Sequence, residues 1–248
     1  GNSGTFVLGP DLAIPVTILF TVLIINALNF IDGLDGLAAG VTLIAAIAFF
    51  VYSYQLGKNG FTDIVSPATL LAAALAGACA GFLPHNFYPA RIFMGDSGAL
   101  LLGYTLAAIS VQGLLKTAAL ATLVLPLLVL AVPVLDTSFV VAKRLKNRQP
   151  IYVADARHLH HRFMRLGFSQ RRSVIYLWIW CTSLAIAALA TRFAPPHHHG
   201  RWSLANVLVD LAAGGLAIAA SLYVVYVLEI VKLSTPARRR RDEASRAA

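Results

Sequence analysis

Two long apolar runs are joined by the stretch Asn26-Ala27-Leu28-Asn29-Phe30-Ile31-Asp32-Gly33-Leu34-Asp35-Gly36-Leu37-Ala38-Ala39-Gly40. Each run has about the 20 residues that a helix needs to cross a bilayer. The polar side chains of the stretch are therefore expected where two membrane helices meet water. Because carboxylates and carboxamides are costly to bury in hydrocarbon, they are candidates for a functional site.

The composition is that of an integral membrane protein. Of 248 residues, 58% are hydrophobic and 12% are charged, whereas soluble domains have about 25% charged residues. Apolar runs fill nearly the whole chain, so we expect an all-α fold, a polytopic membrane helix bundle. The net charge of +9 lies beside apolar runs, which indicates membrane topology and anionic lipid rather than nucleic acid.

About seven transmembrane helices are predicted from the apolar runs. Pro126 and Pro133 interrupt the fifth run and predict a bend there. The last run is long for one crossing, which predicts a tilt or a projection into water. The predicted spans are 11–29, 37–57, 65–83, 97–115, 117–142, 173–193 and 204–233.

The basic residues indicate how the bundle is oriented. If the N-terminus is outside, the segments 30–36, 84–96, 143–172 and 234–248 are cytoplasmic, and 16 of the 20 Lys and Arg residues lie on that side when Lys232, at the end of the last span, is counted with them. This bias is the positive-inside signal of multi-pass proteins. The same orientation brings the polar motifs and the C-terminus to the cytoplasmic face of the cell membrane.

The chain divides into a membrane domain, 1–233, and a basic tail, 234–248. The run Arg238-Arg239-Arg240-Arg241 is typical of a juxtamembrane contact with lipid headgroups, and a disordered tail is the alternative. Both cysteines, Cys79 and Cys181, fall inside apolar spans. We therefore expect core or lipid-facing thiols, and neither a disulfide nor a metal site.

In the opening stretch, Asn26, Asn29, Asp32 and Asp35 recur at every third residue. In a continuous helix this spacing would keep the four side chains on one slowly drifting face. Their oxygens are hard ligands of the kind that Mg²⁺ prefers. As an alternative, Asp32 or Asp35 could cap the helix that starts at Leu37, but capping would leave the two Asn residues unexplained.

A second polar motif, 84–98, ends at the start of the fourth predicted span. Asp96 follows a glycine there. It can cap the helix, as Ser97 also can, or it can hold a metal beside a helix N-terminus that attracts phosphate. Phe93 can stack on a base or lie at the membrane interface. Because the first motif offers metal ligands too, we favour a metal and phosphate site.

The third motif lies in loop 143–172, which contains Asp155-Ala156-Arg157-His158-Leu159-His160-His161-Arg162 and then Arg165, Arg171 and Arg172. Three histidines could bind a transition metal, but the surrounding positive charge favours phosphate. We expect an anion-binding loop, with a solvated basic loop as the alternative. Asp136 is another candidate, because isolated intramembrane carboxylates are commonly functional.

These groups are expected together at one face of an apolar bundle. Such a combination suits phosphoryl transfer between a water-soluble phosphorylated donor and a lipid acceptor. In that reaction, positioning and charge neutralisation do most of the catalysis, and a metal ion and arginines supply them.

The motifs resemble those of the polyprenyl-phosphate N-acetylhexosamine-1-phosphate transferase family, which includes the MraY and WecA types. Residues 26–40 are similar to its NAxNxxDGLDGLAAG signature, 93–98 to its FMGDxG signature and 158–161 to its histidine motif. Asn86 lies in what resembles the PxNxxPA element. Residues 167–172 and the HLHHR form resemble the branch that transfers N-acetylglucosamine-1-phosphate.

The resemblance implies a reaction and a set of roles. UDP-N-acetylglucosamine would give its sugar-1-phosphate to a polyprenyl phosphate such as undecaprenyl phosphate, with Mg²⁺ required and UMP released, and this would start a cell-envelope glycan. Asp96 would be the main Mg²⁺ ligand and Asn29 a second contact, while Asp32 and Asp35 would shape the catalytic and nucleotide pocket. The other implied positions are substrate contacts: Asn26, Asn86, Phe93, His158, His160, His161 and Arg162.

The chain departs from the family pattern in one respect. Members carry an Asp-Asp motif in an earlier cytoplasmic loop and have more spans, whereas Asp-Asp occurs nowhere in this sequence. The chain also lacks an initiator Met. We therefore expect the N-terminal helices of the family domain to be absent, and we expect no turnover from these 248 residues alone.

Other functions stay open at this point. Within the enzyme class the alternative is phospho-N-acetylmuramoyl-pentapeptide transfer. A transporter with a cation site is favoured by Asp136, although the other polar groups gather at one face rather than at mid-membrane depth. A regulatory or scaffolding membrane protein is the third alternative. The oligomeric state also stays open, a homodimer included, and Asp210 and Glu229 have no assigned role.

Overall fold

Long helices make up almost all of the described structure. The computed structural model describes residues 10–60, 63–115, 166–194, 197–198 and 201–227, with isolated residues between 131 and 145. Two short antiparallel strands, β1 (His197–His198) and β2 (Arg201–Trp202), lie between the last two helices. The helices are α1 (Pro10–Ile31), α2 (Leu37–Lys58), α3 (Pro67–Asn86), α4 (Gly95–Leu115), α8 (Gln170–Phe193) and α9 (Leu204–Val227).

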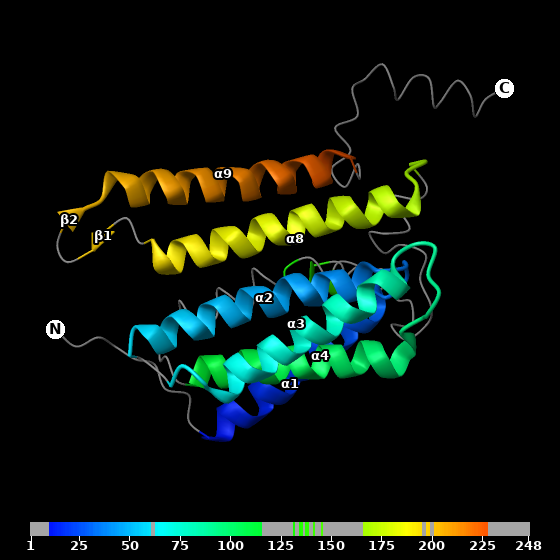
Figure 1. Cartoon of the computed structure of the whole chain (residues 1–248), viewed down its shortest axis with the longest axis horizontal. Helices are drawn as coiled ribbons and strands as arrows, with labels where there is room; N and C mark the ends of the chain where they lie inside the picture. The colour runs from blue at the N-terminus through cyan, green and yellow to red at the C-terminus, as the bar shows by residue number, and fades with distance from the viewer. Residues whose placement is uncertain are drawn as a thin grey trace, which may run out of the picture.

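The helices lie roughly side by side, with α2 in the middle of the bundle (Figure 1). On one side α2 packs against α3, and on the other side it packs against α8, which in turn packs against α9. The helices α1 and α4 pack against each other. The central place of α2 shows in its burial: 67% of its most apolar stretch is buried, against 22% for α1 and 17% for α9.

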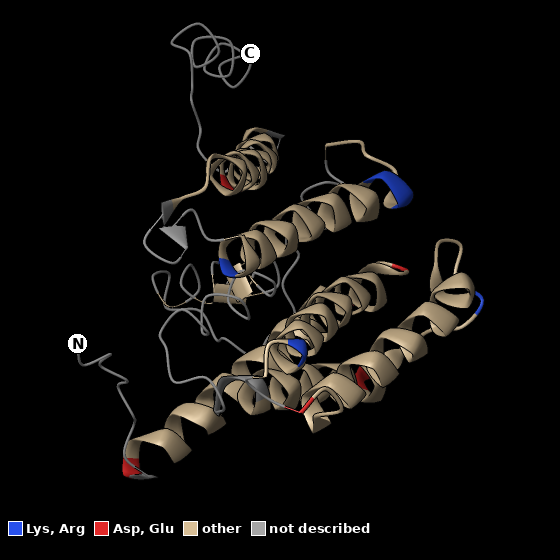
Figure 2. Ribbon diagram, turned by 60° about the vertical axis from the view of Figure 1, so that its left-hand side comes forward, with Lys and Arg blue, Asp and Glu red and all other residues tan. Residues whose placement is uncertain are grey.

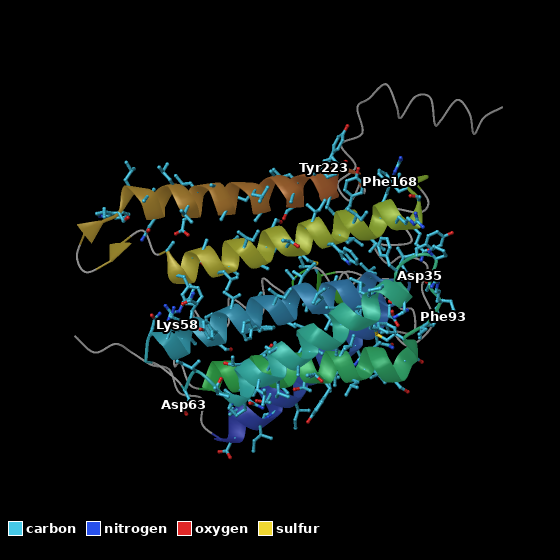
Figure 3. The ribbon with its side chains drawn as sticks, viewed as in Figure 1. Asp35, Lys58, Asp63, Phe93, Phe168 and Tyr223 are labelled. Atoms are coloured by element: carbon cyan, nitrogen blue, oxygen red, sulfur yellow. The ribbon has the colours of Figure 1, made fainter. Side chains whose placement is uncertain are left out.

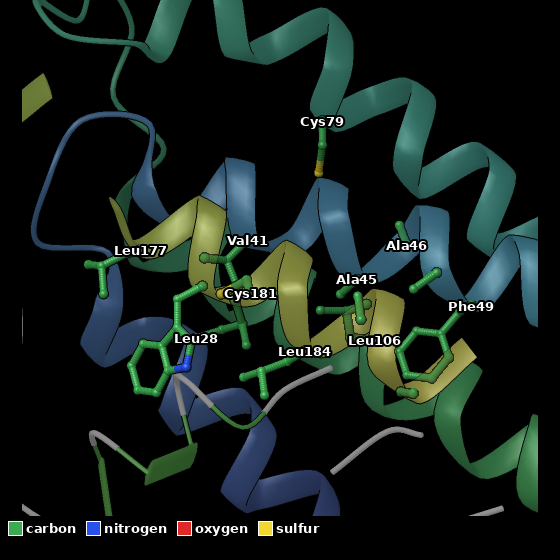
Figure 4. Packing of buried hydrophobic residues seen from close by; sticks show 14 of the residues in the cluster. Leu28, Val41, Ala45, Ala46, Phe49, Cys79, Leu106, Leu177, Cys181 and Leu184 are labelled. Carbon is green, nitrogen blue, oxygen red and sulfur yellow. The ribbon is translucent and has the colours of Figure 1, made fainter. Parts of the chain in front are cut away.

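The core is built around the inward faces of α2 and its neighbours, and Figure 4 shows part of it. Helices in lipid associate through close packing, because lipid tails are as apolar as the side chains that they replace. The thiols of Cys79 and Cys181 are buried and free, as predicted. The largest fully buried side chains come from α1, α2, α4 and α8: Ile24, Leu28, Val41, Thr42, Leu106, Ile109, Val174 and Leu177.

Two glycines mark the closest approaches between helices. A Cβ on Gly40 would overlap the indole ring of Trp178, so α8 reaches α2 only because this side chain is missing. A Cβ on Gly103 would lie 2.7 Å from the Cα of Ile25, so the backbones of α1 and α4 meet there. The second contact is rigid, because backbone atoms cannot rotate away as a side chain can.

The described helices confirm the all-α membrane bundle. Five of them, α1, α2, α3, α8 and α9, are long and apolar enough to cross a membrane. Helix α4 is equally long but starts with polar residues. Charged residues are few and stand mostly at helix ends (Figure 2). The predicted number of about seven spans is not confirmed, because the run 117–142, with its prolines, lies almost wholly outside the described residues.

Gly103→Ala is expected to destabilise the bundle. Its new Cβ would press on backbone atoms of Ile25, and overpacking of this kind costs about 1–3 kcal/mol. The matched control is Gly77→Ala on α3, because a Cβ on Gly77 would have nothing within 4 Å. Alanine favours a helix over glycine by about 1 kcal/mol, so the control should keep or raise the thermal unfolding midpoint in detergent. Equal midpoints for the two variants would contradict the contact between α1 and α4.

Candidate functional site

The polar motifs gather at one end of the bundle, called here the site end. Figure 3 shows Asp35 and Phe93 there, while Lys58 lies at the opposite end. Helices α1 and α3 finish at the site end, and α2, α4 and α8 begin there. The turn 32–36 and the loop 87–94 are therefore neighbours, although they are about 50 residues apart in the chain.

The turn 32–36 separates the polar residues of the first motif. Helix α1 stops at Ile31, and the backbone N–H of Asp32 donates to the carbonyl of Asn29 at 3.2 Å. The turn ends at Gly36, which has a φ of +81°. The four polar residues therefore do not share one helix face. Only the two Asn residues lie on α1, because the two glycines of the stretch let the chain leave the helix.

Neither aspartate of the turn caps α2, so the capping alternative is also wrong. Gly36 stands at the cap position, and no side chain makes a capping hydrogen bond there. The Oδ2 atom of Asp35 instead accepts a hydrogen bond from the backbone N–H of Ala90 at 3.0 Å. This carboxylate thus ties the turn to the loop between α3 and α4.

Asn86 makes the second link between the turn and the loop. Its side chain is only 3% exposed. Its Oδ1 accepts from the backbone N–H of Gly36 at 3.0 Å, and its Nδ2 donates to the carbonyl of Ile92 at 3.0 Å. A Cβ on Gly36 would lie 3.0 Å from the ring of Phe87, so the two segments are in direct contact. The expected contact of Asn86 with a nucleotide stays a prediction, and its Oδ1 and Nδ2 each already have one partner inside the protein.

Asp96 and Asn29 face each other across α4 and α1. Asp96 is exposed in the first turn of α4, and the Nδ2 of Asn29 donates to its Oδ1 at 3.4 Å. The contact between Gly103 and Ile25 holds the two helices together within about two turns of this pair. Amide oxygen and nitrogen are assigned from their partners. A half-turn of the Asn29 amide would aim its oxygen at the same point, an arrangement that a bound cation would favour.

Asp32 is half-buried near two other carboxylates. Burial, followed by the negative charges of Asp96 and Asp35, raises the pKa of Asp32 from 3.8 to about 6. A divalent cation would relieve this repulsion. Among the described residues, no three His, Cys, Asp or Glu side chains form a metal cluster. One carboxylate and one carboxamide nevertheless fit Mg²⁺ in donor type, because this ion usually takes few protein ligands and keeps several waters.

Two other predicted contacts are open to solvent. Phe93 is 75% exposed on the loop 87–94, so it can meet a ligand or lie at the membrane interface. Asn26 is exposed one turn before Asn29, and its Nδ2 donates to the carbonyl of Val22 at 2.8 Å. Among the described residues, no partner of its Oδ1 is seen.

The start of α8 makes contacts that the sequence did not predict. The Nε of Arg171 donates to the carbonyl of Tyr88 at 2.9 Å, and the guanidinium carbon lies 5.8 Å from the centre of the Tyr88 ring. About two turns further along α8, the ring of Trp178 lies 5.5 Å from that of Phe87. The only signal in the sequence was an arginine at the start of a predicted span, and no pattern paired it with a tyrosine 83 residues away.

Part of the predicted site lies outside the described residues. This part includes the whole histidine motif, so the anion-binding loop stays a prediction. Asp136, the residue that favoured a transporter, is also outside, as is the basic tail. The residues concerned are Asp136, His158, His160, His161, Arg162 and 234–248.

The chain is similar to proteins of known name. The profile of Glycosyl transferase family 4 matches residues 1–114. The decaprenyl-phosphate N-acetylglucosaminephosphotransferase of Mycobacterium leprae is 39% identical, over 84% of this chain and 56% of its own length. The probable undecaprenyl-phosphate N-acetylglucosaminyl 1-phosphate transferase of Bacillus subtilis is 41% identical, over 74% of this chain and 49% of its own length.

The chain is also similar to a relative that is named for a different activity. The phospho-N-acetylmuramoyl-pentapeptide-transferase of Moorella thermoacetica is 42% identical, over 66% of this chain and 48% of its own length. The chain therefore spans about half the length of the curated relatives that it matches. The resemblance seen in the motifs thus extends over most of this chain.

Asn86→Ala is expected to lower the unfolding midpoint. It would leave the buried N–H of Gly36 without its acceptor and the carbonyl of Ile92 without its donor, and an unpaired buried donor costs about 1–3 kcal/mol. The control is His85→Ala, because His85 is exposed and only its backbone carbonyl holds the loop. Thermal unfolding in detergent measures both variants, and an unchanged midpoint for Asn86→Ala would contradict the link.

Asp32→Asn is expected to stabilise the protein near neutral pH. The folded protein keeps the Asp32 proton up to about pH 6, whereas the unfolded chain releases it near 3.8. The charge therefore costs stability above about pH 6, and the cost disappears as the pH falls toward 4. In Mg²⁺-free buffer, Asp32→Asn should raise the midpoint at about pH 7.5 but not at about pH 4.

The matched control for this charge removal is Asp63→Asn, at the opposite end of the bundle (Figure 3). Asp63 is exposed, so its replacement should leave the midpoint nearly unchanged at both pH values. The same gain for Asp32→Asn at both pH values would show that the gain does not come from the carboxylate charge.

Proposed function

We propose that this chain, whose residues 1–114 match the profile of Glycosyl transferase family 4, acts in transferring N-acetylglucosamine-1-phosphate from UDP-N-acetylglucosamine to a polyprenyl phosphate. The names of the mycobacterial and Bacillus relatives support this donor and this acceptor. The observation that carries the proposal is the pairing of Asn29 with Asp96, beside Asp32, where an apolar bundle meets water. A soluble donor and a lipid acceptor can meet only at such a boundary.

The chemistry is a substitution at phosphorus. An oxygen of the polyprenyl phosphate forms a bond to the β-phosphorus of the donor. The bond between that phosphorus and the oxygen that bridges the two phosphates breaks, and UMP leaves with the bridging oxygen. Both reactants are anions, so catalysis of the step needs neutralisation of negative charge and alignment more than it needs acids and bases.

The residues of the site end can meet these needs. Asp96 and Asn29 would hold Mg²⁺, which when bound neutralises charge on phosphate oxygens. Asp35 fixes the turn against the loop through its bond to Ala90. The start of α4 adds the positive end of a helix dipole beside Asp96. Arg91 is exposed on the adjoining loop, where it offers charge to an anionic substrate.

We propose that the site end faces the cytoplasm, across the cell membrane. Of the 20 Lys and Arg residues, 16 would then lie on the inner side, which agrees with the positive-inside rule. Arg91, Arg171 and Arg172 belong to the site end, while Lys58 and Arg192 end helices at the opposite side. A nucleotide sugar made in the cytoplasm would reach the site from that side.

A second donor is favoured by one specific observation. The Moorella relative, 42% identical over 66% of this chain, is named for phospho-N-acetylmuramoyl-pentapeptide transfer. The same site chemistry would serve that reaction, because only the sugar of the donor differs. The residues 167–172, which resemble the N-acetylglucosamine branch, favour the first donor.

UMP release tests the proposal. The whole gene product is purified in detergent and mixed with polyprenyl phosphate, Mg²⁺ and either UDP-N-acetylglucosamine or the UDP-N-acetylmuramoyl-pentapeptide. Release with the first donor alone supports the proposed function, and release with the second alone replaces the donor but keeps the chemistry. A folded protein that releases UMP with neither donor would contradict the proposal.

Asp96→Asn is expected to lower Mg²⁺-dependent UMP release by about a hundredfold or more, since residues that only support a metal ligand already cost about 10- to 100-fold. The control is Asp63→Asn, which removes a carboxylate from the opposite end and should leave the rate unchanged. Both variants should keep the unfolding midpoint within a few degrees, because both side chains are exposed. A near-normal rate for Asp96→Asn would remove this residue from the metal site.

A further inference from the structure

The loop 87–94 is held at three points, each from a different part of the fold. From inside, Asn86 binds the carbonyl of Ile92. From the turn, Asp35 accepts from the N–H of Ala90. From α8, Arg171 donates to the carbonyl of Tyr88. The first two links join segments next to helices α1 to α4, and the third brings in α8, which comes much later in the chain.

We propose that Arg171 is a positioning residue, which sets the loop 87–94 for the donor substrate through Tyr88 rather than by lending its charge to a phosphate. The proposal rests on the function proposed above, because it concerns the loop that carries Phe93 and leads into Asp96. It replaces the expectation from the sequence that this arginine belongs to a general anion-binding set.

Arg171 contacts Tyr88 in two ways, and both contacts depend on direction. The donor is Nε, the inner nitrogen of the guanidinium, at 2.9 Å from the Tyr88 carbonyl. The same guanidinium lies 5.8 Å from the centre of the Tyr88 ring, within the range of a cation–π contact. One tyrosine thus meets this arginine through its backbone and its ring together, which restrains both the position and the tilt of the loop.

Arg171 lies in the first turn of α8, and hydrogen bonds hold this turn in place. Ser169 caps α8, and its Oγ accepts from the backbone N–H of Arg172. The hydroxyl of Ser173 donates back to the carbonyl of Ser169 at 3.1 Å. These bonds fix the first turn of α8, from which Arg171 reaches the loop 87–94 next to the site. A shift of this loop would displace Phe93 and Arg91, the two exposed groups suited to a nucleotide.

The substitution Arg171→Lys separates position from charge. Lysine keeps the positive charge but has neither a donor at the Nε position nor a planar group to lie over the ring. If Arg171 acts as a charge, Arg171→Lys should behave like the wild type and Arg171→Gln should not. If Arg171 positions the loop, Arg171→Lys and Arg171→Gln should loosen the loop and weaken donor binding to the same extent. Arg172→Gln is the matched control, because this exposed residue lies on the same helix turn. The described structure shows no contact between its side chain and the loop 87–94.

Amide hydrogen exchange of the whole protein, measured without substrate, reports directly how firmly the loop 87–94 is held. The amides of Arg91 and Ile92 donate to the carbonyl of His85 at 2.8 and 3.1 Å, and that of Ala90 donates to Asp35. Exchange in the peptide 87–94 should rise about tenfold in Arg171→Lys and Arg171→Gln, as expected for the loss of one hydrogen bond to a charged group. Arg172→Gln should exchange as the wild type does. Tyr88→Leu, which keeps the carbonyl but removes the ring, should show a smaller rise.

The kinetic measurement is the KM of the nucleotide sugar in the UMP-release assay. We expect a KM about tenfold higher in Arg171→Lys and Arg171→Gln, with kcat within about twofold of the wild type, because a displaced loop weakens donor binding. Wild-type KM and wild-type exchange in Arg171→Lys would overturn the proposal in favour of a charge role. Faster exchange with unchanged KM would also overturn it, since Arg171 would then hold the loop without serving the donor.

The failure of the proposed function is a separate result. If folded wild-type protein releases no UMP from either donor, the reaction is wrong, while the exchange data still decide whether Arg171 fixes the loop. Exchange in Arg171→Lys equal to that of the wild type would then overturn the inference by itself.

Discussion

The side-chain amide of Asn86 is the interaction on which the geometry of the site end depends. A buried amide must satisfy both its donor and its acceptor, or it costs more than it stabilises. Asn86 does so by accepting from Gly36 in one segment and donating to Ile92 in the other. Since these segments carry Asp32 and Asp35 on one side and lead into Asp96 on the other, a single buried side chain sets how the carboxylates face each other.

This link works only because the helices beneath it cannot slide. In a membrane the hydrophobic effect does not drive one helix against another, so position comes from close packing. The contact of Gly103 with Ile25 fixes α4 against α1, and the contact of Gly40 with Trp178 fixes α8 against α2. The pair of Asn29 and Asp96 depends on the first contact. The arginine at the start of α8 depends on the second, so packing in the middle of the bundle governs polar geometry at its end.

The sequence predicted what depends on composition and chain order, and it failed where contacts between distant residues decide. Six of the predicted spans coincide with described helices to within a few residues at most of their ends, because the length of an apolar run is set by the bilayer. The gathering of the first two motifs at one end followed from the alternating direction of the helices. The three-residue spacing does not say where the helix ends, and α1 stops at Ile31. The spacing cannot reveal that Gly36 takes a left-handed conformation to meet Asn86.

The roles of individual polar residues were the least predictable part. Asn86, which was expected to meet a nucleotide, also holds two segments together, and its motif did not indicate this. Arg171 was placed in a general basic loop, and it contacts Tyr88. Nothing in a single sequence states which groups lie opposite each other when they are 50 or 83 residues apart. The residue types limited the chemistry, but the partner of each residue came only from the fold.

The three carboxylates at the site end have different environments, and the differences bear on function. Asp35 is used in the structure, through its bond to Ala90. Asp96 is exposed and faces the amide of Asn29. Asp32 is half-buried between them, and its raised pKa shows that its charge is unfavourable in the protein alone. A fold selected for stability alone would not keep three like charges so close together at a helix junction. Proteins retain such unfavourable groups where a binding partner offsets them, and a cation that bridges the site and an anionic substrate is the partner that this arrangement of charges favours.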